Sequence, residues 1–285
     1  MTVDVDIQVR PAVLADQSQI ANLMHFSLHV HRHLDWRYAL DWIDSPPFLV
    51  LETKGQMSAA LACPPDPPRV AWIRLFVNSG KISLEKAWQA LWENACSDLS
   101  RQGRFLAAAI ALEEWYIPLL LASGFENRQS IVMLERDGGF PADALPWVGF
   151  SIHAMRQSDL PAVAAVDAAA FDLLWQNSLP ALKQAFPQAV LASVAESQGR
   201  VIGYQISTRN PLGAHLARLA VLPEVQGRGI GYALVADLAE QAGRLGMTHL
   251  TVNTQSDNAT SLALYQRAGF HETGERYPVF QLQIP

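Results

Sequence analysis

The sequence is poor in cysteine and in basic charge, and it has no long hydrophobic run. Its 285 residues include two cysteines, Cys63 and Cys96, whose spacing fits neither a metal site nor a redox pair, so a reducing compartment is expected. Acidic residues number 27 against 21 basic ones, and the net charge of −6 argues against binding nucleic acid through a broad basic surface. No apolar run approaches the ~20 residues of a membrane span, and residues 1–6 lack a signal-peptide pattern. We therefore expect a cytoplasmic protein that binds no membrane.

The chain is rich in apolar residues, and it repeats itself. Half of its residues are hydrophobic and 17% are charged, which suffices for a substantial core in each of two domains. A Gly-Phe pair ends a helical segment at Gly124 and again 145 residues later at Gly269. The same order of elements precedes each pair, which indicates two copies of one domain. The matching segments are Ile7–Leu23 with Ile152–Val166, Phe48–Cys63 with Val190–Thr208, and Trp72–Val77 with Leu216–Val221.

The stretch Gln226–Gly231, which reads QGRGIG, lies between an apolar strand and an amphipathic helix. The strand covers residues 215–221, and the apolar positions that follow have helical spacing until Gly246. The first amide groups of a helix have no partner within it, and the helix dipole adds a partial positive charge there. The loop therefore predicts an anion site, and we expect a β-carbon at Gly229 or Gly231 to hold a phosphate away.

Three known loop types compete for this stretch. A P-loop requires Gly-Lys-Ser/Thr, which is absent, and the dinucleotide pattern GxGxxG requires a glycine where Leu234 stands. From this stretch alone, an ordinary glycine turn without a ligand remains an alternative interpretation.

A second motif follows at the expected distance. The β-rich segment His249–Thr254 leads to Asn258, a suitable helix cap, and to a short helix that contains Tyr265 and ends at Gly269. Together the two motifs, QxxGxG and NxxSxxxYxxxGF, resemble the GNAT family of acetyl-coenzyme A dependent N-acyltransferases over Arg218–Phe270. The resemblance implies a mixed α+β fold of two tandem GNAT domains, each with a twisted mixed sheet flanked by helices.

The resemblance also implies the site. In this family the loop backbone holds the pyrophosphate of coenzyme A, the preceding strand pairs with its pantetheine arm, and the tyrosine lies near the thioester sulfur. By this resemblance acetyl-CoA is the co-substrate, with no metal, and the residues expected to bind it are Leu219, Ala220, Val221, Gln226, Gly227, Arg228, Gly229, Ile230, Gly231, Asn258, Ser261 and Tyr265.

Candidates for the catalytic and acceptor roles are fewer. Tyr265 is a candidate proton donor to the leaving thiolate, and His215 is a candidate base because histidine titrates near neutral pH. Asp172 and Trp175 form an acidic and aromatic pair suited to an amine cation. Each residue also has a purely structural interpretation: Tyr265 as a packed aromatic residue, His215 as a strand residue, and Trp175 as part of the core.

The first copy differs where this chemistry would occur. Glu85 stands about where Gly229 would align, and a carboxylate there would repel a pyrophosphate. Glu113 and Leu120 stand where Asn258 and Tyr265 do. We expect domains at residues 1–138, without a coenzyme loop, and 150–285, catalytic, joined by a linker at 139–149. The first copy could then serve as a scaffold, as part of the acceptor groove or in a homodimer.

Four histidines of the first copy lie close together in the sequence. The spacing of His25 and His29 would suit a helical metal pair, but neither HExxH nor a cysteine ligand accompanies them. We expect a polar, aromatic helix-loop rather than a metal site in this cluster, which also contains His31 and His33.

The predicted function is transfer of an acetyl group from acetyl-CoA to a primary amine of a small molecule or peptide, directly and within a ternary complex. The second copy contains no cysteine to carry an acyl-enzyme intermediate. The alternatives are a non-catalytic coenzyme A binding module and a transferase for a longer acyl group.

Overall fold

The structure, a computed structural model, describes residues 7–138 and 149–285. These residues form two compact units. Unit 1 contains the described residues up to Arg128 together with Tyr277–Pro285, and unit 2 contains Gln129–Arg276. Of the predicted linker 139–149, all but Gly149 lies outside the described residues.

Unit 1 is built around a sheet of five strands in the order β1-β3-β4-β6-β2. A second set of strands in this unit begins with β5, which pairs in parallel with β7. The elements are β1 (Ile7–Pro11), α1 (Gln17–Phe26), β2 (His29–Arg32), β3 (Phe48–Thr53), β4 (Gln56–Ala62), β5 (Val70–Trp72), β6 (Leu75–Asn78), α2 (Leu84–Ser100), β7 (Phe105–Ile110) and α3 (Ile117–Ala122).

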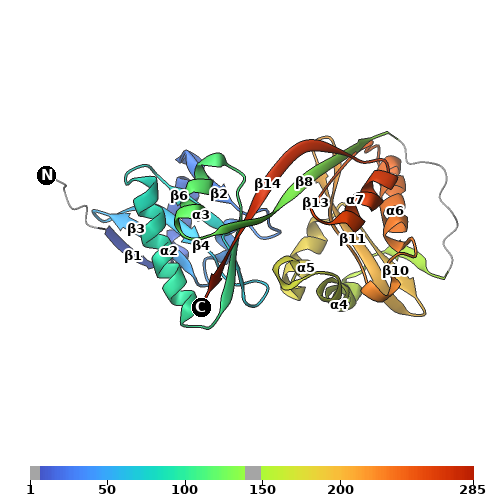
Figure 1. Ribbon diagram of the computed structural model, residues 1–285, viewed down its shortest axis with the longest axis horizontal. Helices are drawn as coiled ribbons and strands as arrows, with labels where there is room; N and C mark the ends of the chain where they lie inside the picture. Colours follow the sequence, from blue (N-terminus) through green and yellow to red (C-terminus); the bar gives the residue numbers. More distant parts are fainter. Residues whose placement is uncertain (1–6, 139–148) are drawn as a thin grey trace. The chain divides into compact units, whose positions relative to one another are not determined.

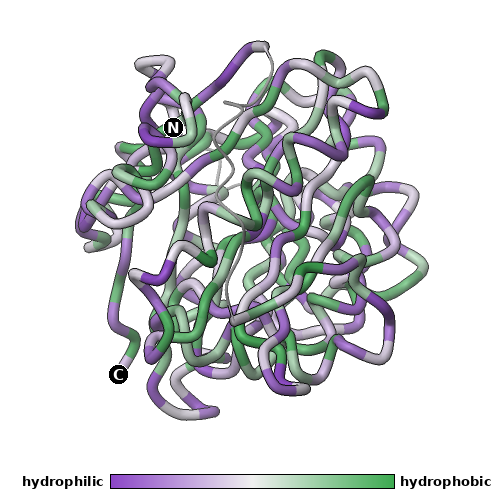
Figure 2. The backbone as a smooth tube through the Cα atoms, turned by 90° about the vertical axis from the view of Figure 1, so that its right-hand side faces the viewer, coloured by the Kyte–Doolittle hydropathy of each residue, from purple (hydrophilic) through white to green (hydrophobic). Residues whose placement is uncertain are grey.

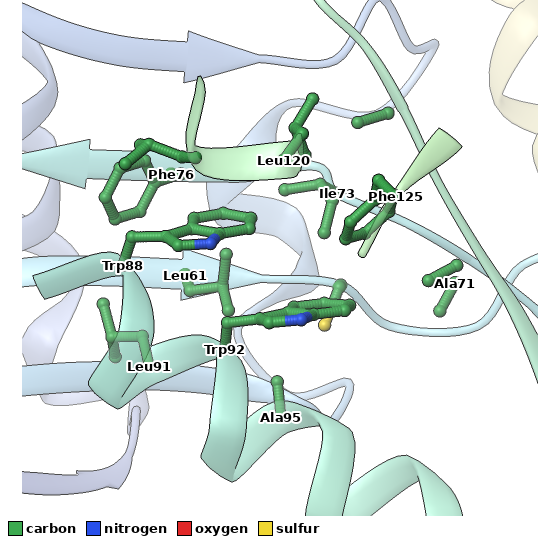
Figure 3. Close-up of a cluster of buried hydrophobic side chains, with 14 of the residues drawn as sticks. Leu61, Ala71, Ile73, Phe76, Trp88, Leu91, Trp92, Ala95, Leu120 and Phe125 are labelled. Atoms are coloured by element: carbon green, nitrogen blue, oxygen red, sulfur yellow. The ribbon is translucent and has the colours of Figure 1, made fainter. Parts of the chain in front are cut away.

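The core of unit 1 lies between these strands and α2. This helix places apolar residues on one face at helical spacing, and Trp88 and Trp92 stack with their ring centroids 5.6 Å apart. Figure 3 shows both indole rings below Phe76, which lies on β6, and below Ile73, which follows β5, within one buried cluster. Burial of such large side chains is the main stabilising contribution in this unit.

Unit 2 is built on the strand order β8-β13-β12-β11-β10-β9. In Figure 1, α4 covers one face of these strands and α6 the other. The elements are β8 (Glu126–Asp137), β9 (Ser151–Ala154), α4 (Leu160–Ala170), α5 (Leu179–Ala185), β10 (Leu191–Ser197), β11 (Arg200–Asn210), β12 (Gly213–Val221), α6 (Ile230–Arg244), β13 (His249–Gln255), α7 (Ala259–Arg267) and β14 (His271–Ile284).

The two units repeat one architecture, as the sequence predicts. The β3–β4 hairpin turns at Lys54 and Gly55 with φ of 51° and 72°, and the β10–β11 hairpin turns at Gln198 and Gly199 with φ of 51° and 75°. Both residues of each turn are left-handed, as a two-residue turn between twisted strands requires.

The backbone tube in Figure 2 is hydrophobic along many inner stretches and hydrophilic at the outer turns, which is the pattern of a buried sheet.

The two sequence copies exchange their last strands. After α3 the chain enters β8, whose residues 131–137 pair with β13 of unit 2. After α7 it enters β14, whose residues 279–284 pair with β7 of unit 1. The compact units therefore do not follow the predicted division into 1–138 and 150–285. Periodicity indicates where a strand is, but not which open edge it joins.

The described part of the chain contains no helix of the length and apolar content needed to cross a bilayer.

Candidate active site

Unit 2 contains a cavity of about 650 Å³ where the ends of several elements meet. Its volume lies in the range of small-molecule sites. The cavity brings together most of the residues that the sequence assigns to acetyl-CoA and both residues that it assigns to the acceptor. Those in the lining are Asp172, Trp175, Leu219, Ala220, Val221, Gln226, Gly227, Gly229, Ile230, Gly231, Asn258 and Ser261.

The glycine loop enters α6 through a left-handed turn. Gly227 and Gly229 have φ of 75° and 82°, and Gly229 is the N-cap of the helix, with no side chain that caps the first turn. The side-chain amide of Gln226 donates a hydrogen bond of 2.9 Å to the carbonyl of Val221 and so ties the loop to the end of β12. The helix therefore begins at an exposed turn without a side-chain acceptor, where an anion is stabilised.

Two of these glycines also have roles within the protein itself. A β-carbon at Gly229 would meet no protein atom within 4 Å, and the positive φ of this residue by itself favours glycine. Whether a β-carbon would hold a phosphate away stays a prediction. Gly231 has no positive φ, but a β-carbon there would lie 2.7 Å from Cδ1 of Leu264. Its role is to let α6 approach α7.

The second motif folds as expected. The Oδ1 atom of Asn258 accepts a hydrogen bond of 3.0 Å from the backbone amide of Ser261, which confirms Asn258 as the cap of α7. Both residues line the cavity.

Tyr265 and Arg228 are not among the residues that line this cavity. Tyr265 is buried in the unit 2 core, 5.8 Å from Phe270 between ring centroids. Burial raises the pKa of Tyr265, and the positive charge of Arg218 opposes part of that rise. The phenol therefore keeps its proton at neutral pH.

His215 also lies away from the cavity lining. It stands four residues before Leu219 on β12, which corresponds to roughly 13 Å along an extended strand. Its Nδ1 atom is 2.9 Å from Oγ1 of Thr251 on the neighbouring strand, and burial lowers the pKa of His215. This arrangement favours a structural role.

The sequence reasoning missed a buried ionic cluster behind the acceptor side of the cavity. Asp167 on α4 is fully buried, and it accepts hydrogen bonds from the guanidinium of Arg218 and from the hydroxyl of Tyr204. Burial alone would lower the pKa of Arg218, but Tyr204 and Asp167 outweigh it, and the pKa is raised. The sequence feature that could have indicated this cluster is Arg218, a charged residue inside the mostly apolar strand 214–221.

Further lining residues were also missed, because their side chains converge only in the fold. Among them, the guanidinium of Arg267 lies 4.9 Å from the ring centroid of Tyr232. The others are Gln129, Ala170, Phe171, Gln255, Asp257, Thr260, Ala263 and Leu264.

The two units differ at the edge of the strand that borders this cavity. In unit 2 the parallel pairing of β12 with β13 ends at Leu216 and Val252, and residues 219–221, beyond that point, line the cavity. In unit 1 the parallel pairing of β5 with β7 ends at the equivalent residues, Trp72 and Ala108. There, however, the following strand β6 is paired along its length with β2.

The other substituted positions of unit 1 lie in ordinary structural roles. Ser83 caps α2 by accepting a hydrogen bond from the amide of Lys86, and Glu85 lies in the first turn. Glu113 is exposed at the start of a short turn, and Leu120 is fully buried.

The histidine cluster does not form a helical pair. His25 lies in the last turn of α1, which ends at Phe26, and His29 begins β2, so the i, i+4 spacing spans the end of the helix. His31 is buried against Tyr116, and burial lowers the pKa of His31 to about 4. His33 stacks on Trp72. Within residues 7–138 and 149–285, no group of three or more His, Cys, Asp or Glu side chains is placed to hold a metal ion.

Comparison with known proteins agrees with this geometry. The profile of the Acetyltransferase (GNAT) family matches residues 155–270. The [ribosomal protein bS18]-alanine N-acetyltransferase of Escherichia coli is 27% identical over 122 residues, which are 43% of this chain and 81% of that protein.

Two solved structures resemble the whole chain. A GCN5-related N-acetyltransferase from Sphaerobacter thermophilus superposes with a TM-score of 0.65 at 17% identity, covering 98% of this chain and 96% of that one. A tandem GNAT protein from the clavulanic acid biosynthesis pathway gives a TM-score of 0.67 at 16% identity, covering 98% and 99%. At these identities the likeness establishes the fold, which is the tandem GNAT fold that the sequence predicts.

The family match and the activity of the E. coli relative indicate an acyl-CoA dependent N-acyltransferase. The chain matches the acetyltransferase (GNAT) family over residues 155–270, which are most of unit 2, and members of this family use acetyl-CoA as co-substrate. Its activity is acetyl transfer to an amine.

Proposed function

We propose that the unit 2 cavity binds acetyl-CoA and a primary amine together and that the acetyl group passes directly between them. The observation that carries this proposal is the composition of one cavity lining. It contains the glycine loop and the end of β12 as well as the segment with Asp172 and Trp175. Both substrates can therefore meet without a second site.

The coenzyme side of the cavity fits a diphosphate and an amide-containing arm. The uncapped start of α6, with the left-handed Gly227 and Gly229, suits the pyrophosphate. Residues 219–221 lie beyond the pairing with β13, so their backbone suits the pantetheine amides. Acetyl-CoA supplies the activated thioester.

The chain's own residues then have three tasks. The strand backbone near Ala220 stabilises negative charge on the carbonyl oxygen as the amine nitrogen attacks and the C–S bond breaks. Tyr265 serves as proton donor to the thiolate: its raised pKa keeps it protonated, and it directly follows Leu264, which lines the cavity, although its own ring is buried. The carboxylate of Asp172, exposed at the cavity, attracts the amine cation and is better placed than His215 to receive its proton.

We assign a single coenzyme site to the chain, in unit 2. In unit 1 the equivalent strand edge on β6 is hydrogen-bonded to β2, from His29 opposite Asn78 to Arg32 opposite Leu75. The backbone of β2 thus occupies the position beside β6 that a pantetheine arm would need. The carboxylate of Glu85 in the first turn of α2 adds electrostatic repulsion.

For the acceptor we favour a peptide amino terminus. The relative from E. coli is named for a ribosomal protein alanine. The family profile spans every cavity residue except Gln129. The exposed Asp172 and the aromatic Trp175, which both line the cavity, suit a small ammonium group of this kind.

Two measurements test the proposal. Titration calorimetry with acetyl-CoA should give one site per chain, and thiol release should require an added amine. Short peptides with a free N-terminal alanine are compared with the same peptides N-acetylated beforehand. Binding without thiol release for any amine would instead identify a coenzyme-binding module, and two equal sites per chain would refute the silent first unit.

A further inference from the structure

The carboxylate of Asp167 and the guanidinium of Arg218 form a two-pronged ion pair inside unit 2. The Nε atom of Arg218 lies 2.7 Å from Oδ2 of Asp167, and Nη2 lies 2.9 Å from Oδ1. The side chain of Asp167 is 0% exposed and that of Arg218 is 12% exposed. Such a buried pair contributes little net stability, because both charges must leave water. Its presence therefore calls for another explanation.

The pair is attached to the acceptor wall of the cavity, which we define as residues 171–177. Nη2 of Arg218 donates a hydrogen bond of 2.6 Å to the carbonyl of Trp175, and its guanidinium lies 3.6 Å from the ring centroid of Phe171. Oδ1 of Asp167 accepts a hydrogen bond of 2.7 Å from the amide of Asn177. The ion pair therefore contacts the wall at its first residue, Phe171, at Trp175, and at its last residue, Asn177.

Neither member of the pair lines the cavity, whereas Phe171, Asp172 and Trp175 do. The coenzyme side has separate supports, namely the left-handed glycines and the bond from Gln226 to Val221. A change in the pair should therefore move the acceptor wall and leave the glycine loop in place.

We propose that Arg218 and Asp167 are positioning residues that set amine selectivity by fixing the acceptor wall. This inference rests on the proposed function, since the wall must face the amine. The fork of Arg218 is essential, because a lysine at this position retains the charge but cannot bond both carboxylate oxygens, the Trp175 carbonyl and the Phe171 ring together.

The test compares Arg218→Lys with a matched control, Arg74→Lys. Arg74 occupies the equivalent sequence position in unit 1, is buried, and also forms a buried ion pair, with Asp35 at 2.6 Å. Both variants lose a buried arginine fork, so both should lower the melting temperature. Only Arg218→Lys should alter kinetics.

With alanine-terminated peptides as the amine probe, Arg218→Lys should lower kcat/KM about 10- to 100-fold, mainly through the KM for the peptide, because a displacement of about 1 Å has an effect of this size. The Kd for acetyl-CoA should stay within about twofold. Asp167→Asn should act in the same direction. An unchanged peptide KM in Arg218→Lys, or an equal change in Arg74→Lys, would overturn the inference.

Hydrogen exchange gives a readout that needs no turnover. In Arg218→Lys the amides of residues 171–177 should exchange faster than in the parent, while those of residues 226–231 should keep the parental rate. If the parent releases no thiol with any amine, the proposed function fails, and the exchange pattern still decides whether the pair fixes the wall. Equal acceleration in both segments would show general loosening and refute a specific positioning role.

Discussion

Replacement of Gly229 by glutamate tests the anion site in isolation from folding. The residue is exposed, its φ is 82°, and a β-carbon would meet nothing within 4 Å. A left-handed non-glycine residue costs about 1–2 kcal/mol of stability. A carboxylate at a helix N-terminus regains about 0.3–1 kcal/mol from the helix dipole, so the variant should fold.

The same carboxylate should expel a diphosphate from the loop. Two like charges about 4 Å apart repel by about 1 kcal/mol in bulk water and about 4 kcal/mol near a protein surface. Since about 1.4 kcal/mol is a tenfold change, the affinity for acetyl-CoA should fall between about 5-fold and several hundred-fold.

Gly246→Glu is the matched control at the other end of α6. Its φ is 76° and its β-carbon would also meet nothing within 4 Å, so it carries the same strain and the same charge. A helix of 15 residues separates the two positions by roughly 22 Å. Calorimetric titration of both variants with acetyl-CoA decides the matter. Equal affinities of the two variants would refute an anion site at the glycine loop.

Three further changes probe the proton donor, the buried histidine and the unit 1 core. Tyr265→Phe should lower kcat by about 10²-fold and leave the Kd for acetyl-CoA nearly unchanged; unaltered turnover would remove this residue from the mechanism. His31 has an ordinary pKa of 6.5 and a folded value of about 4, so the unfolded chain binds the proton more tightly. Stability should thus decrease as pH falls from about 6.5 to 4, by about 3 kcal/mol, and His31→Asn should lose this part of the decrease in denaturant titrations. Trp88→Ala should cost about 3–5 kcal/mol in the same assay, and a loss below 1 kcal/mol would contradict the packing seen around this ring.

Local signals in the sequence were sufficient for the elements of the site. The turns at Lys54-Gly55 and Gln198-Gly199, the QGRGIG loop and the Asn258 cap each depend on residues that are neighbours in the chain. The positive φ of a glycine or the cap of a helix follows from such short-range chemistry, so these features could be predicted.

Features that depend on distant contacts could not be predicted. Asp167 and Arg218 are 51 residues apart, and no pattern in the sequence indicates that their side chains meet. The depth of Tyr265 and the position of His215 relative to the cavity follow from how α7 and β12 pack. Likewise, β2 fits the edge of β6 through backbone groups that every residue carries.

Because of the exchanged strands, each half of the sequence supplies a strand that the other half needs to complete its sheet. A chain that stopped near residue 276 would keep every residue of the cavity but would lose the strand that pairs with β7. Conversely, a fragment beginning at residue 150 would leave β13 with a bare edge, open to aggregation. Each copy therefore depends on a strand from the other for a complete sheet, so neither copy can be removed without exposing a sheet edge in the other.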